Sequence, residues 1–182
     1  MARYRRSSIA GGTYFFTVVT YRRRFLFDHA KSRQILREIV QEVRAKHPFT
    51  IDAWVMLPDH MHCLWTLPED CADFSLRWNL IKAGFSRRAK SFFHVDVWMN
   101  ASKRKHREST IWQRRFWEHR IRNEREFRIY VDYTHYNPVK HGWVDKVVDW
   151  PFSTFHRYAK AGMYPQGWGD HAMDIDLPGV RT

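Results

Sequence analysis

The chain has 182 residues, the size of one globular domain that is long enough to bury a hydrophobic core. Its 31 lysines and arginines outnumber its 19 aspartates and glutamates, so the net charge is +12. Together with an aromatic content of 16%, this charge favours a polyanionic partner such as nucleic acid, because basic groups neutralise phosphates and aromatic rings stack on bases. A soluble basic protein without such a partner is the alternative.

Cysteine usage and hydropathy bear on the cellular compartment. Cys63 and Cys71 form neither a CxxC pair nor a disulfide framework, which fits a reducing cytoplasm. No apolar run approaches the roughly 20 residues of a membrane span, and the N-terminus lacks the apolar region of a signal peptide. We therefore expect a cytoplasmic protein without a membrane partner.

Arginines flank the first predicted strand. Residues 13–21 are rich in β-branched and aromatic side chains, which predicts a central strand. The arginines that follow it, Arg22, Arg23 and Arg24, are either solvated loop residues or contacts to phosphates. Arg3, Arg5 and Arg6 precede it.

Two helix patterns surround a predicted β-hairpin. Residues 28–46 and residues 74–92 carry apolar side chains at intervals of three and four, which predicts amphipathic helices. Between them, residues 49–57 and 60–67 show strand patterns on either side of a Pro-Asp turn.

The second strand of this hairpin carries two histidines. Because successive side chains on a strand point to opposite faces, His60 and His62 share one face, while Met61 and Cys63 point to the other. Two imidazoles on one face can share a metal ion, and two hydrogen-bonded histidines without a metal are the alternative. A structural zinc site that uses Cys63 is a weaker hypothesis, because Cys63 faces away from the pair.

A basic segment and an aromatic run open the second half of the chain. Residues 102–109 are basic and poor in apolar side chains, which predicts a loop that is either a phosphate-binding excursion or a surface insert. Residues 111–120 alternate aromatic and basic residues, a pattern typical of single-stranded nucleic-acid surfaces. Trp112 and Arg115 are its candidate DNA contacts. Alternatively, the apolar members of this run complete the core of the sheet.

A third helix is predicted from Asn123, an N-cap candidate with Glu126 three residues later. It should end at Asn137, because Pro138 disfavours helical dihedral angles in the residue before it, and residues 138–143 should form a new turn. Beyond a short closing element, the tail from about residue 162 either docks or frays.

Tyr133 and Asn137 lie four residues apart on this helix, so both side chains project toward the same point. If that face meets the histidine pair, the Asn137 amide oxygen can complete a metal site. A phenol beside a metal ion and arginines has its anion favoured, which a tyrosine nucleophile requires. Tyr130 and Tyr136 are competing candidates, and all three tyrosines can instead belong to the core.

Four stretches, in one order, carry a family resemblance. They are LPDHMH at residues 57–62, WQRRFWE at 112–118, VDYTHYNPVKHG at 131–142 and WPFST at 150–154. Their combination resembles the bacterial REP-associated tyrosine transposases of the HUH single-tyrosine transposase superfamily. The resemblance extends from about residue 4 to about residue 156, and the basic segment lies outside the family pattern.

The resemblance implies an α+β, ferredoxin-like HUH domain over residues 1–160, with helices packed on an antiparallel sheet, followed by a tail at 161–182. It further implies that Tyr133 is the nucleophile, that His60 and His62 bind a metal ion, and that Asn137 is the third ligand. The implied cofactor is Mg²⁺ or Mn²⁺, although imidazoles alone would suit Zn²⁺ equally well.

The implied activity is metal-assisted transesterification of single-stranded hairpin DNA from repetitive extragenic palindromes. The products are a 5′-phosphotyrosine link and a free 3′-hydroxyl, which can be rejoined. The arginines and Trp112 named above are the expected contacts to the hairpin. Two alternatives remain, a non-catalytic nucleic-acid-binding protein and a nuclease that uses water, and either a monomer or a homodimer is compatible with the sequence.

Overall fold

The computed structural model describes residues 9–171, 173, 175 and 177, and a four-stranded sheet forms its centre. The strands lie in the order β2-β3-β1-β4, and every neighbouring pair is antiparallel. Their bounds are β1 Thr13–Val19, β2 Thr50–Met56, β3 His60–Thr66 and β4 Trp117–Arg120. The predicted α+β class with an antiparallel sheet is confirmed, and the predicted first strand and hairpin supply its three longest strands.

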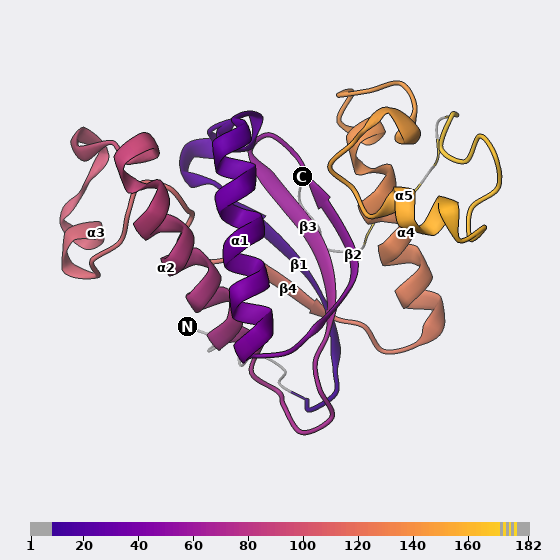
Figure 1. Ribbon diagram of the computed structural model, residues 1–182, viewed down its shortest axis with the longest axis horizontal. Coiled ribbons are helices and arrows are strands. Elements are labelled where there is room, and N and C mark those ends of the chain that lie inside the picture. Colours follow the sequence, from indigo (N-terminus) through magenta and orange to yellow (C-terminus); the bar gives the residue numbers. More distant parts are fainter. Residues whose placement is uncertain (1–8, 172, 174, 176, 178–182) are drawn as a thin grey trace.

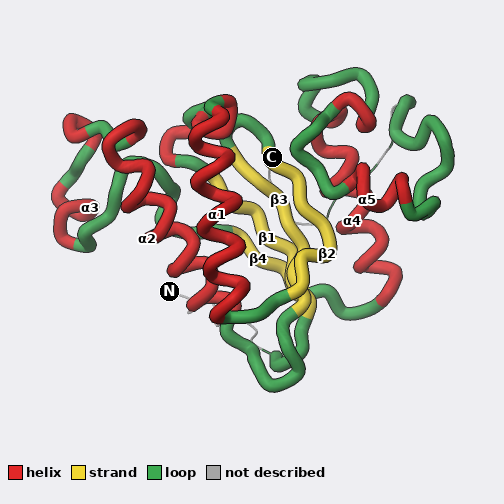
Figure 2. The backbone as a smooth tube through the Cα atoms, in the orientation of Figure 1, coloured by secondary structure: helices red, strands yellow, loops and turns green. Residues whose placement is uncertain are grey.

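Helices lie on both sides of this sheet (Figure 1). The long helices α1 (Ala30–Lys46) and α2 (Phe74–Phe93) cover one face, and α4 (Glu124–Lys140) packs on β2 and β3 from the other. Two short helices stand between loop segments in Figure 2: α3 (Ala101–Lys105) in the connection from α2 to β4, and α5 (Phe155–Lys160) in the segment that follows α4. Across the part of the chain that is described, no helix is long and apolar enough to cross a membrane.

The alternation of side chains on β3 divides the core in two. Met61, Cys63 and Trp65 are buried in the cluster that α1 and α2 complete. Leu64, on the opposite face, joins Phe15 and residues of α4 in a second cluster. The strand is therefore buried on both sides, and the face that carries the histidines lies under α4.

Helix α4 continues past Pro138, so the prediction that a helix ends at Asn137 and a new turn begins is wrong. Pro138 is buried together with the residues of α4 that precede it, and this tertiary packing outweighs the local preference against proline. The helix ends at a glycine instead. Gly142 has a φ of 67°, its N–H donates to the Val139 carbonyl, and the Trp143 N–H donates to the Pro138 carbonyl.

The basic segment that was predicted to be a loop contains the short helix α3, so the prediction is wrong for these residues. Asn100 caps the helix, because its side-chain oxygen accepts the Lys103 N–H at 2.8 Å. Lys103 is only 6% exposed, and its ammonium group donates to the Ser109 carbonyl at 3.1 Å. Capping and burial of one lysine stem thus order a segment whose composition suggests a solvated loop.

The described residues near the C-terminus lie against α4. The Tyr164 hydroxyl donates to Asp132 Oδ1 at 2.9 Å and lies 2.8 Å from His135 Nδ1. The Trp168 ring stacks on the Tyr164 ring, with 4.1 Å between their centroids. Of the two alternatives for this segment, these residues dock, whereas the domain boundary at residue 160 stays a prediction.

Candidate active site

The two histidines of β3 lie side by side on the face of the sheet that α4 covers. Their ring centroids are 4.9 Å apart, and His60 and His62 are 4% and 2% exposed. The shared face follows from their spacing on a strand, as predicted.

Both rings are oriented through their Nδ1 atoms. His60 Nδ1 lies 2.5 Å from Asp59 Oδ1, and the other oxygen of this carboxylate accepts a hydrogen bond from Arg23 at 3.0 Å. His62 Nδ1 lies 2.9 Å from the hydroxyl oxygen of Thr17 on β1. Because Nδ1 is engaged on each ring, Nε2 is the nitrogen that each can offer to a metal ion.

Burial and neighbouring charges favour a neutral His62 and an ionised Asp59. Burial lowers the pKa of His62 well below its ordinary value, and the charges of His60 and His141 lower it further. Burial alone would raise the pKa of Asp59, but hydrogen bonds and charges from His60 and Arg23 outweigh it and lower the pKa. A neutral imidazole binds metal, and an ionised carboxylate holds a ligating histidine in place.

Helix α4 brings Tyr133 and Asn137 to this pair. The Tyr133 ring centroid lies 5.4 Å from that of His62 and 6.0 Å from that of Phe15. Asn137, one helical turn later, is fully buried, and within the described residues neither atom of its amide has a hydrogen-bond partner. The tyrosine and the histidines thus meet within one chain.

Whether a metal ion fits this site can be judged from its buried polar atoms that have no hydrogen-bond partner among the described residues, such as those of the Asn137 amide. His62 Nε2 is also buried without a hydrogen-bond partner from the described part of the chain, and leaving such groups unpaired costs free energy unless a ligand meets them. No three histidine, cysteine, aspartate or glutamate side chains of that part are placed to hold a metal ion. A site here therefore needs the Asn137 oxygen beside the histidines, and this donor set fits a divalent cation.

Three residues of this site were not predicted from the sequence: His141, Asp59 and Thr17. The His141 ring centroid lies 5.3 Å from that of His60, and its buried Nε2 has no hydrogen-bond partner among the residues described. Burial, followed by the charge of His60, lowers the pKa of His141. A lone histidine at the end of a helix gives no sequence signal for this proximity. Thr17 would have followed from the strand pairing, since it lies opposite His62 in the register of β1 and β3.

The predicted arginine cluster lies at the rim of the site. Arg22 and Arg23 have φ values of 58° and 50°, and both lie in the turn that follows β1. Arg23 binds Asp59, whereas the guanidinium groups of Arg22 and Arg24 lie 4.8 and 5.0 Å from the ring centroid of Trp98. The turn thus contacts Asp59, which orients His60, and it also contacts Trp98 in the connection between α2 and β4.

Trp112 lies in the core, which corrects its predicted position on a DNA-binding surface. It is 5% exposed, and its ring centroid is 5.8 Å from that of Phe27 and 5.0 Å from that of Phe85. The expected stacking on a base does not fit this position, because neighbouring rings take the space a base would need. Arg115 is exposed, as a DNA contact requires. The remaining candidates, Arg3, Arg5 and Arg6, lie outside the described residues.

Comparison with known proteins places this geometry in a family. The sequence model of the IS200-like transposases matches residues 9–137. A REP-associated tyrosine transposase of Escherichia coli (strain K12) is 48% identical over 175 residues, which cover 96% of this chain and 95% of that protein. A solved structure of a REP-associated tyrosine transposase bound to a REP hairpin has 44% identity and a TM-score of 0.77, and the match covers 100% of both chains. The chain therefore belongs to the REP-associated tyrosine transposases.

Proposed function

We propose that this tyrosine transposase cleaves and rejoins single-stranded DNA of hairpin-forming repeats, with Tyr133 as the nucleophile. The observation that carries the proposal is the convergence of α4 on β3, which sets the Tyr133 ring 5.4 Å from the His62 ring. The substrate class is supported by the related structure, which is bound to a REP hairpin.

In the proposed reaction, the Tyr133 oxygen attacks the phosphorus of one phosphodiester. The new bond joins this oxygen to phosphorus, while the bond between phosphorus and the 3′ oxygen breaks. The products are a 5′-phosphotyrosine link and a free 3′-hydroxyl, and attack by a 3′-hydroxyl on the link restores the strand without ATP. The Lys140 ammonium group lies 5.0 Å from the Tyr133 ring centroid, and its positive charge favours the phenolate.

The proposed cofactor is Mg²⁺ or Mn²⁺, which when bound would polarise the scissile phosphate and stabilise its added negative charge. His60, His62 and Asn137 would hold the ion. Support comes from the buried and unpartnered His62 Nε2 and Asn137 amide within the described residues. The protein itself orients these donors. Asp59 holds the His60 ring through its Nδ1 atom, and Thr17 holds the His62 ring in the same way.

Incubation with single-stranded hairpin DNA and Mn²⁺ or Mg²⁺, followed by denaturing gel electrophoresis, tests the nucleophile. We expect a covalent protein–DNA adduct that is lost in Tyr133→Phe and in His60→Ala. Tyr136→Phe is the matched control, because the Tyr136 hydroxyl accepts the Met173 backbone N–H instead of facing the histidines. Cleavage without an adduct would indicate water as the nucleophile, and binding without cleavage would indicate a non-catalytic binding protein.

Metal binding is tested separately from activity. Isothermal titration calorimetry of the wild type with Mn²⁺ should show binding that His60→Ala and Asn137→Ala each weaken by about tenfold or more. Equal affinities in the wild type and both variants would remove these residues from the proposed ligand set.

A further inference from the structure

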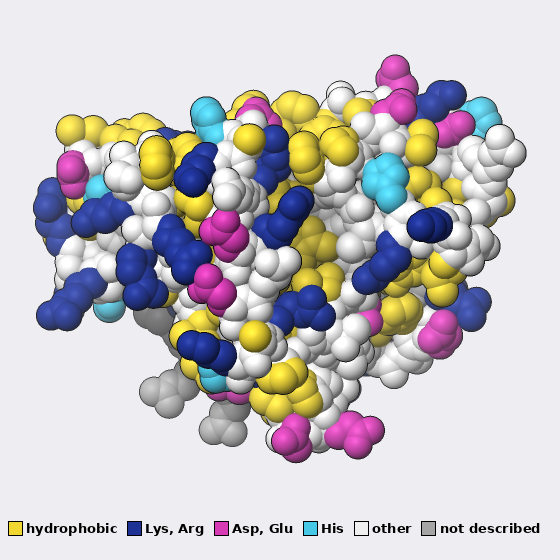
Figure 3. All heavy atoms as spheres, in the orientation of Figure 1, with side chains coloured by type: hydrophobic (Ala, Val, Ile, Leu, Met, Phe, Trp, Pro, Cys, Tyr) yellow, Lys and Arg dark blue, Asp and Glu magenta, His cyan; other side chains and the backbone are white. Residues whose placement is uncertain are grey.

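A basic groove lies between α2 and the connection of residues 94–116 that leads to β4. It encloses about 820 Å³. Its lining includes two acidic residues, Asp96 and Glu108, and the basic residues Lys82, Arg87, Lys90, Arg104, Arg107 and Arg114. Figure 3 shows lysine and arginine side chains gathered over this end of the molecule. Residues 104–107 supply part of this wall.

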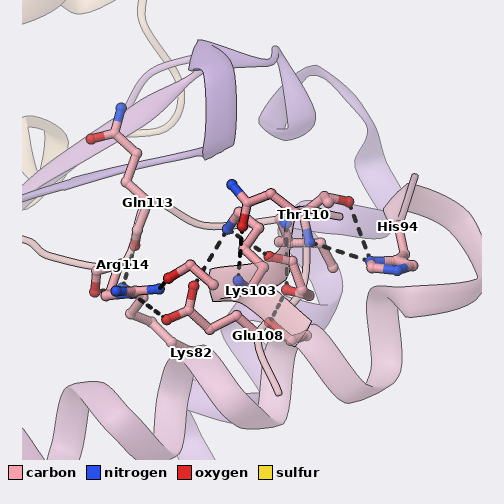
Figure 4. Close-up of polar contacts among 12 residues, drawn as sticks. Lys82, His94, Lys103, Glu108, Thr110, Gln113 and Arg114 are labelled. Atoms are coloured by element: carbon pink, nitrogen blue, oxygen red, sulfur yellow. Dashed lines mark hydrogen bonds and ion pairs between the residues drawn. The ribbon is translucent and has the colours of Figure 1, made fainter. Parts of the chain in front are cut away.

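Polar contacts hold the wall of the basic groove in a defined shape (Figure 4). Lys82 of α2 donates to the backbone carbonyls of Gln113 and Arg114, at 2.7 and 3.0 Å. Glu108 pairs with Arg114 and lies 3.5 Å from the Lys103 ammonium group. A surface that is ordered before its ligand arrives loses less conformational entropy on binding.

Four basic residues of the groove remain available to a ligand: Arg87, Lys90, Arg104 and Arg107. All four are exposed, and none forms an ion pair with any residue that the structure describes. Arg88, on the same helix, instead pairs with Glu42 at 2.8 Å. We call these four side chains the groove cations. Exposed cations that converge on one groove without acidic partners attract phosphate groups.

The connection that walls the basic groove also contacts the turn at the rim of the active site. Trp98, in the same connection, packs beneath the guanidinium groups of Arg22 and Arg24. The Lys103 ammonium group lies 4.1 Å from the centroid of the Tyr21 ring, which precedes these arginines. Arg23, between them, binds the carboxylate that orients His60. Arg22, Arg23 and Arg24 therefore lie between the histidine pair and the connection that walls the groove.

We propose that the basic groove binds the phosphate backbone of the base-paired stem of the hairpin whose unpaired strand reaches Tyr133. This inference rests on the proposed function for its substrate. The groove cations are long and flexible, and Trp112, the one tryptophan, tyrosine or phenylalanine among the described lining residues, is held in the core. Such a surface binds phosphates and positions the DNA without reading its bases. The groove therefore contributes affinity that increases with stem length, and it contributes no sequence preference.

The test compares two variants of the full chain that lose the same number of positive charges. The groove variant carries Arg87→Gln, Lys90→Gln, Arg104→Gln and Arg107→Gln. The control variant removes exposed charges that form no ion pair with a described residue and lie outside the groove. It carries Lys31→Gln, Lys46→Gln, Arg125→Gln and Lys160→Gln.

Affinity for hairpins with a long and a short stem is measured by fluorescence anisotropy at several salt concentrations. For the long stem we expect the groove variant to bind about tenfold more weakly and its salt slope to fall by about 3, because up to four phosphate contacts are lost. For the short stem, the two variants should bind alike. Equal affinity of both variants for the long stem would overturn the proposal, as would an equal loss for an unstructured strand of the same length.

A second readout separates this proposal from the proposed function. Adduct formation on the short-stemmed hairpin should be equal in the two variants, since the groove cations do not contact Tyr133. If no protein forms an adduct but only the groove variant loses affinity for long stems, the proposed chemistry fails and the groove proposal stands. If adducts form throughout and stem length has no effect on affinity, the groove proposal fails alone.

Discussion

At the scale of single residues, two histidines of one strand depend on different groups for their orientation. His60 is held by the Asp59 carboxylate, which also pairs with Arg23, whereas His62 is held by the neutral hydroxyl of Thr17. A carboxylate partner increases the basicity of a ligating imidazole more than a hydroxyl does. The two rings would therefore offer the proposed metal ion donors of unequal strength although they share one face.

Replacement of Thr17 by valine tests this orienting role. Thr17→Val keeps the shape of the side chain but removes the partner of His62 Nδ1, so the ring loses its fixed orientation. We expect the affinity for Mn²⁺, measured by isothermal titration calorimetry, to fall by about tenfold. Thr13→Val on the same strand removes a hydroxyl that bonds Thr66 at 2.8 Å, away from the histidines, and should leave the affinity unchanged. Equal effects of both substitutions would refute the role of Thr17.

At the scale of elements, α4 carries the site and owes its length to the way it ends. Two hydrogen bonds close the helix around Gly142, whose φ of 67° is unfavourable for residues with a Cβ atom. A Cβ atom at this position would have no neighbour within 4 Å. Any cost of substitution therefore comes from the backbone conformation and not from a clash.

Gly142→Ala should lower the free energy of unfolding by about 1 kcal/mol, because alanine is strained in the left-handed region. Gly142→Asn should cost less, since the short polar side chain of asparagine tolerates this region. Urea unfolding followed by circular dichroism measures both variants. The explanation fails if alanine and asparagine destabilise the protein equally.

The connection that carries α3 depends on an ion-pair cluster at Glu108. Partial burial alone would raise the pKa of Glu108, but Arg114 and then Lys103 lower it below its ordinary value of 4.5. Because the pKa is lower in the folded state, this carboxylate stabilises the connection above that ordinary value, and the contribution is lost as the pH falls through the lowered pKa.

Glu108→Gln should therefore loosen the connection at neutral pH. Hydrogen–deuterium exchange should show faster exchange for residues 101–110 in the variant at pH 7, and the difference from the wild type should shrink as the pH falls below about 4.5. Amides of β3 serve as the internal control and should exchange at the same rate in both proteins. Equal protection of the connection at pH 7 would contradict the stated role of Glu108.

At the scale of the whole molecule, the described residues of the C-terminal segment complete the outer side of α4. Tyr164 links two residues of that helix, Asp132 and His135. Burial lowers the pKa of His135 to about 3, so this imidazole is neutral at pH 7 and depends on hydrogen bonds for its polar atoms. One side of α4 thus presents Tyr133 to the histidines, and Tyr164 of the C-terminal segment contacts its other side.

Tyr164→Phe should lower the free energy of unfolding by about 1 to 3 kcal/mol, because it leaves a buried imidazole and a partly buried carboxylate without a shared partner. Tyr158→Phe is the comparison, since its hydroxyl donates to the Asp52 backbone carbonyl, and it should cost less. Chemical denaturation of both variants measures the difference. If Tyr164→Phe unfolds like the wild type, the segment docks without stabilising the fold.

The local features of the site could be predicted because they depend on the repeats of regular structure. A strand repeats every two residues, so His60 and His62 had to share a face wherever that strand lay in the sheet. A helix repeats every 3.6 residues, so Tyr133 and Asn137 had to project together once the segment was helical. The Asn123 cap is equally local, since its side chain accepts the Glu126 N–H at 2.9 Å.

Only the tertiary structure decided which of these faces meet and which surfaces remain open. His141 reaches His60, and Trp112 enters the core, through contacts between segments that are distant in the chain. Pro138 remains helical because burial of α4 outweighs its local preference, and the basic segment becomes a groove wall because it packs against α2. By itself, the sequence determined the positions that periodicity and capping set within each element. The contacts between elements depend on the free energy of burying the whole core, which no short stretch of residues contains.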